Sequence, residues 1–131
     1  MGNENRIRMN VEVLKDGAII PTPAKGGAVD LYACLGCASV AVLPHKTREV
    51  PCGISITIDD NYELLIRPII EQLYDKSKRI NAYLYPKEGN NGELVITLMN
   101  DGDFPFTISE GMRIAPGIVV PKMQVEIIHH P

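Results

Sequence analysis

The stretch Ile54-Ser55-Ile56-Thr57-Ile58-Asp59-Asp60-Asn61 combines the two patterns that decide the fold. Its first five residues alternate between apolar and polar side chains, which is the period of a strand with one buried face, and the three polar residues that follow are typical of a turn. The same period of two recurs over Val11–Leu14, Leu94–Leu98 and Val125–Ile127. Ten prolines and eleven glycines divide the chain into short segments. We therefore predict an all-β fold of many short strands: a sandwich, barrel or jelly roll.

One segment has a helical period. Ile69, Ile70 and Leu73 could share a face of a helix over Ile69–Lys78, but Pro68 and the charged end of the segment keep it short. We predict at most one short helix.

Length and charge limit the organisation and the partners. A chain of 131 residues fits one domain, which we place at residues 9–131 after a flexible tail over residues 1–8. The net charge of −3, without a cluster of Lys and Arg, argues against nucleic acid as a partner.

The sequence also indicates the cellular compartment and whether the chain associates with a membrane. No apolar run approaches the roughly 20 residues that a membrane helix needs, and the first eight residues have no signal-peptide pattern. Three cysteines are an odd number, which suits a reducing compartment better than a disulfide framework. We expect a cytoplasmic protein that does not bind a membrane.

Seven short segments carry a resemblance. In chain order they are Pro21–Ala33, Leu43–Lys46, Val50–Ile54, Asn61–Leu64, Asn91–Leu94, Leu98–Asn100 and Ile108–Ala115. Their order and spacing resemble the motifs of the dUTPase superfamily, which comprises the trimeric dUTP diphosphatases and their dCTP deaminase relatives. The resemblance covers about Val11 to Val120.

This resemblance implies a distorted jelly-roll β-barrel that forms a homotrimer, with ligand sites between subunits. The candidate ligand-binding residues are Asp30, Arg67, Tyr83, Tyr85, Lys87, Asn90, Glu93 and Arg113. Alternatives remain for several of them: Asp30 could cap a turn or pair with Arg113 or Arg67, Glu93 could be a solvated or salt-bridged strand residue, and the two tyrosines could serve an interface.

The sequence departs from the family where hydrolysis needs particular groups. Pro68 stands in place of a phosphate-binding Ser, Lys87 in place of the water-activating Asp, and Asn90 in place of the Tyr that closes the base pocket. Met112 and Pro116 replace the Asp and Gln of the fourth motif, and the Gly-rich C-terminal arm is missing. We therefore predict a catalytically inactive protein without a cofactor, of a kind at home in viruses and phages, which binds a nucleotide-like ligand or a protein partner.

Two other functions remain open. A divergent diphosphatase could cleave dUTP or another nucleotide with Mg²⁺, using Asp30, Glu88 or Glu93 to hold the metal and water. A trimeric structural component of a virion or other assembly would need no nucleotide.

The order Cys34, Cys37, His45, Cys52 also supplies four zinc-type ligands. Cysteines in strands are commonly small buried apolar residues, so this is a weak zinc candidate.

Overall fold

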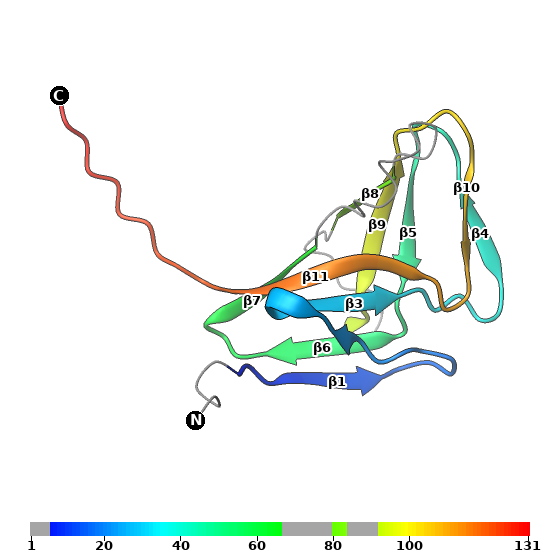
Figure 1. Cartoon of the computed structure of the whole chain (residues 1–131), viewed down its shortest axis with the longest axis horizontal. Coiled ribbons are helices and arrows are strands. Elements are labelled where there is room, and N and C mark those ends of the chain that lie inside the picture. The colour runs from blue at the N-terminus through cyan, green and yellow to red at the C-terminus, as the bar shows by residue number, and fades with distance from the viewer. Residues whose placement is uncertain (1–5, 67–79, 84–91) are drawn as a thin grey trace.

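The computed structural model describes residues 6–66, 80–83 and 92–131 (Figure 1). Within these ranges the chain forms strands and one short 3-10 turn, Lys25–Gly27. The strands are β1 (Met9–Val13), β2 (Thr22–Pro23), β3 (Ala28–Tyr32), β4 (Ser39–Val42), β5 (Thr47–Pro51), β6 (Ile54–Ile58), β7 (Tyr62–Ile66), β8 (Ile80–Tyr83), β9 (Val95–Asn100), β10 (Phe106–Ser109) and β11 (Arg113–Pro121). The all-β prediction is confirmed.

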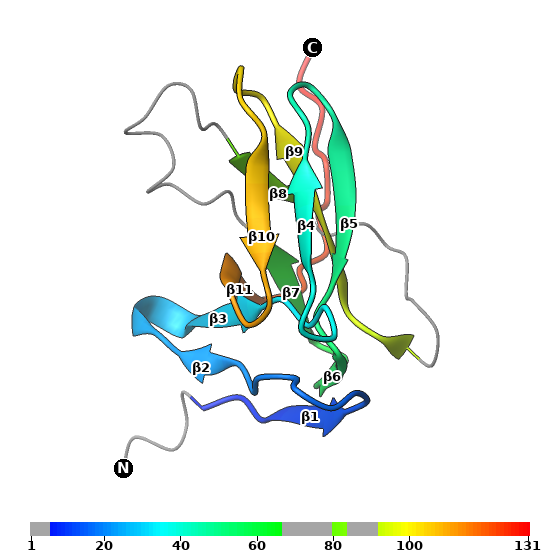
Figure 2. The same cartoon turned by 90° about the vertical axis from the view of Figure 1, so that its right-hand side faces the viewer.

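The strands pair antiparallel in four small sheets. The sheet orders are β1-β6, β10-β4, β2-β3-β11-β7 and β5-β9-β8. Figure 2 shows β4, β5, β9 and β10 standing upright above β1, β2 and β3, which run across them. Strands far apart in sequence thus become neighbours, and β11 joins β3 to β7.

The predicted strands can be compared directly with the observed ones. The segments at 11–14, 54–58 and 94–98 coincide with β1, β6 and β9 to within two residues at each end. The helical segment Ile69–Lys78 lies outside the described residues. No helix in the described part of the chain is long and apolar enough to cross a membrane.

The hydrophobic core is built from the apolar residues that alternate with polar ones along the strands. The largest fully buried apolar side chains come from seven strands, β3 to β6 and β9 to β11: Leu31, Val42, Val50, Ile54, Ile96, Leu98, Ile108 and Ile114. Because side chains alternate across a strand, the inward direction of Leu31 on β3 turns Asp30 and Tyr32 outward. The core packing of β3 thereby exposes a polar face.

The last ten residues leave the body. After β11 the chain runs extended from Lys122 to Pro131 and projects away from the strands (Figure 1), and all ten residues are exposed. The strand predicted over Val125–Ile127 is therefore wrong for this structure. The alternation makes an extended chain that could pair, but a strand also needs a neighbour to bond with.

Candidate functional site

An aspartate and an arginine meet on the outward face of the four-stranded sheet. Asp30 lies on β3 and Arg113 at the start of β11, and the Asp30 Oδ1 to Arg113 Nη1 distance is 3.3 Å. The Asp30 side chain is 22% exposed and that of Arg113 40%, so solvent reaches both charges. The prediction that Asp30 could pair with Arg113 is confirmed, and the pair leaves a carboxylate and a guanidinium within reach of a ligand.

Two hydroxyl groups lie on the same sheet. The hydroxyls of Thr22 and Tyr32 are 2.8 Å apart and share a hydrogen bond, and Thr22 of β2 pairs across from Asp30. Tyr32 follows Asp30 by two residues and so shares its face. Sequence reasoning did not select these two residues, although the period of two through Asp30 would have found Tyr32.

Glu93 has a different environment from the one expected of a ligand-binding carboxylate. It is 5% exposed, its Oε2 accepts a hydrogen bond of 2.8 Å from the Gly53 N–H, and its Oε1 lies 3.1 Å from Lys15 Nζ. The alternative of a salt-bridged residue describes this geometry, because both carboxylate oxygens are engaged in joining three segments of the fold.

The other five candidate ligand-binding residues do not belong to the described part of this site. Arg67, Tyr85, Lys87 and Asn90 lie outside the described residues, as do Pro68 and Glu88. Tyr83 belongs to β8, where its backbone pairs with Thr97.

The four zinc candidates do not come together. Cys52 follows β5 and its N–H donates to Leu94 O, whereas the His45 N–H donates to Asn100 O. These contacts lie at opposite ends of the β5–β9 pair, and the six residue steps from Leu94 to Asn100 span about 20 Å of strand. Among the described residues, no three His, Cys, Asp or Glu side chains gather as metal ligands.

The cysteines themselves are free thiols in different environments. Cys34 and Cys52 are buried, and Cys37 is exposed. Burial, reinforced by the carboxylate of Glu93, raises the pKa of Cys52 to about 12, and burial likewise raises the pKa of Cys34. Both buried cysteines therefore pack as neutral thiols, and the four residues suggested for zinc do not gather into a site in this structure.

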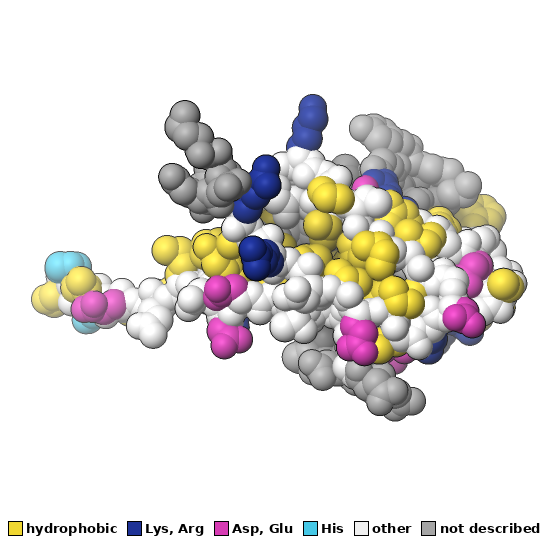
Figure 3. Space-filling model, turned by 90° about the horizontal axis from the view of Figure 1, so that it is seen from below, with side chains coloured by type: hydrophobic (Ala, Val, Ile, Leu, Met, Phe, Trp, Pro, Cys, Tyr) yellow, Lys and Arg dark blue, Asp and Glu magenta, His cyan; other side chains and the backbone are white. Residues whose placement is uncertain are grey.

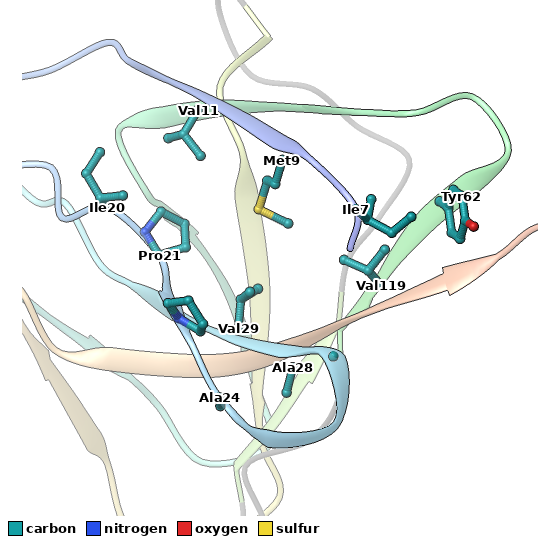
Figure 4. Close-up of a pocket in the computed structure, with 12 residues that line it drawn as sticks. Ile7, Met9, Val11, Ile20, Pro21, Ala24, Ala28, Val29, Tyr62 and Val119 are labelled. Atoms are coloured by element: carbon teal, nitrogen blue, oxygen red, sulfur yellow. The ribbon is translucent and has the colours of Figure 1, made fainter. Parts of the chain in front are cut away.

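A separate groove opens between β1 and the β3–β11 sheet (Figure 4). It has a volume of about 610 Å³, and Figure 4 shows Met9 and Val29 pointing into the same space from opposite walls. Its lining residues are Ile7, Met9, Val11, Ile20, Pro21, Pro23, Ala24, Gly27, Ala28, Val29, Tyr62 and Val119. None of these side chains carries a charge, so the groove suits an apolar group better than a triphosphate.

Comparisons with known proteins agree with this geometry. No protein-family model matches the sequence. A deoxyuridine 5'-triphosphate nucleotidohydrolase of Picosynechococcus is 34% identical over 124 residues, 91% of this chain and 85% of that protein. The enzyme of the same name from Rhizobium rhizogenes is 32% identical over 130 residues, 95% of this chain and 83% of that protein.

Solved structures show the fold. The dUTPase of Staphylococcus bacteriophage 80alpha, solved as a mutant with dUpNHpp, superposes with a TM-score of 0.69 at 17% identity, covering 94% of this chain and 96% of that one. A mutant dUTPase from phage phi11 of S. aureus, described with a structural Mg(II) ion, gives 0.69 at 15% identity, with the same two coverages.

The strand arrangement is therefore the jelly-roll fold of the solved dUTPases, as the resemblance implied. By its identity to the bacterial enzymes, the chain belongs to the deoxyuridine 5'-triphosphate nucleotidohydrolase family.

This membership corrects the prediction of a catalytically inactive protein. That prediction rested on Pro68, Lys87 and Asn90, which lie outside the described residues, and on Met112 and Pro116. The relatives, including one from Chlamydia caviae that is 34% identical over 118 residues, are named as nucleotidohydrolases. The active alternative fits these relatives better than the inactive reading.

Proposed function

We propose that this protein hydrolyses dUTP between its α- and β-phosphates, with water as the nucleophile and dUMP and pyrophosphate as products. The observation that carries the proposal is 34% identity to a dUTP nucleotidohydrolase over 91% of the chain. The Asp30–Arg113 pair on the outward face of β3 and β11 supports it, because this face offers opposite charges to a solvated ligand.

Arg113 would bind a phosphate oxygen. A guanidinium presents parallel N–H donors that match phosphate geometry, and the 40% exposure of Arg113 leaves it accessible. A phosphate at this position competes with Asp30 for the arginine, so substrate binding loosens the ion pair and leaves the Asp30 carboxylate available.

Asp30 fits a role toward Mg²⁺. In nucleotide enzymes this ion is usually held by one or two carboxylates together with substrate phosphates and water, rather than by a complete protein cage. A single, partly exposed carboxylate beside an arginine satisfies that requirement. Bound Mg²⁺ would neutralise phosphate charge and so weaken the bond to the leaving pyrophosphate.

The water-orienting role falls to a carboxylate other than Glu93. The hydrogen bond from Gly53 and the ion pair with Lys15 engage both oxygens of Glu93. Of the three carboxylates suggested by the sequence, Asp30 and Glu88 therefore remain candidates.

The assembly we propose is a homotrimer, as the resemblance implies. The extended tail, Lys122–Pro131, exposes Met123, Val125 and Ile127 by 83–86%, which is a large apolar cost for an isolated chain. Figure 3 shows hydrophobic side chains on the segment that projects from the body. The uncharged groove beside β1 is a surface on which a neighbouring copy could cover such side chains. Burial of the tail between copies would account for its apolar alternation.

The cytoplasm remains the proposed location, because three free cysteines suit a reducing compartment. A viral or phage source stays a prediction: the curated relatives are bacterial, and the solved neighbours come from phages.

The test is turnover of dUTP by the purified chain with Mg²⁺, followed as pyrophosphate release, with dCTP and dTTP as competing substrates. We expect release from dUTP, abolished by a chelator, and a loss of at least about 100-fold in kcat/KM for Asp30→Asn, which keeps the shape but removes the charge. Asp60→Asn, in the exposed turn before β7, is the matched control and should leave the rate unchanged. A folded protein that releases no pyrophosphate from any of the three nucleotides would overturn the proposal.

A further inference from the structure

The Glu110 carboxylate is hydrogen-bonded to a loop that is more than 70 residues away in sequence. It lies in the turn between β10 and β11, and its carboxylate reaches the loop that follows β3. Its Oε1 accepts hydrogen bonds from the N–H groups of Leu35 at 2.7 Å and Gly111 at 3.2 Å, and its Oε2 accepts one from Cys37 at 3.0 Å.

These hydrogen bonds favour the ionised form of the carboxylate. The N–H groups of Cys37 and Leu35, with a smaller contribution from Gly111, lower the pKa of Glu110 below its usual range. Backbone hydrogen bonds surround them: the Ala33 N–H donates to Met112 O, and the Gly111 N–H to Ala33 O. Ala33, which follows β3, is thereby hydrogen-bonded to both Gly111 and Met112, the two residues just before β11.

The hydrogen bonds around Glu110 lie next to a β-bulge in the β3–β11 pair. Arg113 pairs with Tyr32, but the next pair is Ala115 with Leu31, so β11 carries one extra residue at Ile114. A bulge of this kind interrupts the ladder locally. Beyond it, the buried Ala115 and the pairing of β11 with β7 hold the strand, but Arg113 lies on the other side, between the bulge and the Glu110 turn.

The position of Arg113 therefore depends on the Glu110 turn. Arg113 reaches diagonally from its pairing partner Tyr32 to Asp30, two residues along the same face of β3. A slip of one residue in register would move its side chain to the opposite face. Hydrogen bonds at Leu35 and Cys37 oppose such a slip, because they fix the turn only three residues before Arg113.

We propose that Glu110 is a positioning residue for the site: it holds the start of β11 in register so that the Arg113 guanidinium stays beside Asp30. The consequence for catalysis rests on the proposed dUTP hydrolysis, but the structural consequence does not. Glu110 itself touches neither substrate nor metal.

The first measurement is amide hydrogen exchange, which needs no turnover. In Glu110→Ala we expect exchange at Ala33 and Gly111 to be at least about tenfold faster than in the unmodified chain, with no change at Ile96 in the core. Glu110→Gln keeps one acceptor oxygen and the side-chain volume, so its exchange should be intermediate. Glu12→Ala, an exposed glutamate on β1, is the control and should leave these amides unchanged. Unchanged exchange at Ala33 and Gly111 in Glu110→Ala would overturn the proposal.

The second measurement is the dUTP kinetics of the same variants. Glu110→Ala should lose about tenfold in kcat/KM, with Glu110→Gln recovering part of it, and should cause no further loss in an Arg113→Ala background. Additive losses in the double variant would show that Glu110 does not act through Arg113. If the unmodified chain has no turnover, the proposed function fails, while the exchange data still decide the role of Glu110.

Discussion

Glu93 shows at the scale of one residue how a side chain predicted to bind a ligand can instead stabilise the fold. Its carboxylate is nearly inaccessible and engages Gly53 and Lys15, which come from two other segments. The two contacts should contribute differently to the free energy of unfolding, because the Gly53 N–H is buried whereas the Lys15 side chain is 52% exposed.

We expect Glu93→Ala to lower the free energy of unfolding by about 2–3 kcal/mol, because a buried N–H is left without its charged acceptor. Lys15→Ala removes only a solvated ion-pair partner and should cost about 0.5 kcal/mol. Urea denaturation of both variants measures the difference. Equal losses would mean that the ion pair, rather than the Gly53 hydrogen bond, holds Glu93.

At the scale of elements, the sequence predicted strands wherever alternation was bounded by turns, as at β1, β6 and β9. It failed at Val125–Ile127, because alternation gives the face of a strand but not its partner. The bulge at Ile114 was also unpredictable, since it depends on how β11 meets both β3 and β7.

The corner between β5 and β6 depends on one glycine. Gly53 has φ +72°, and a methyl group there would lie 2.7 Å from Cys34 Sγ and 3.0 Å from Ala18 Cβ. Its carbonyl also accepts hydrogen bonds from the N–H groups of Leu14 and Lys15. Gly26, in the 3-10 turn, has a similar φ of +73° but no neighbour within 4 Å of such a methyl group.

Gly53→Ala should therefore cost about 3 kcal/mol or more, through backbone strain and a clash, whereas Gly26→Ala should cost about 1 kcal/mol through strain alone. Thermal unfolding of the two variants separates the contributions. Similar melting temperatures would show that the Cys34 side chain yields without cost.

At the scale of the whole molecule, the sequence led to the family and to the Asp30–Arg113 pair, because motif order survives where single residues change. It could not show that Glu93 is engaged elsewhere, since that depends on where Lys15 and Gly53 meet in space. The division into a tail over residues 1–8 and one domain over 9–131 stays a prediction, as does the role of Lys87.

The proposed trimer can be tested through the tail. Val125→Lys places a charge on its apolar side, whereas Gln124→Lys places the same charge on the other side of an extended chain. We expect the unmodified chain and Gln124→Lys to have three times the 14.4 kDa chain mass by light scattering, and Val125→Lys to dissociate at micromolar concentration. A monomeric unmodified chain would contradict the trimer.

The exposed tail also makes the protein sensitive to its own abundance. The four large apolar side chains of the tail, Met123, Val125, Ile127 and Ile128, are all exposed and are tolerable only where another molecule covers them. Dilution, which separates the copies, and truncation, which removes the tail, would therefore both reduce the covered fraction. If covering the tail completes the clefts between copies, specific activity would fall on dilution instead of remaining constant. Expression level would then determine not only how many enzyme molecules a cell contains but also what fraction of them is competent.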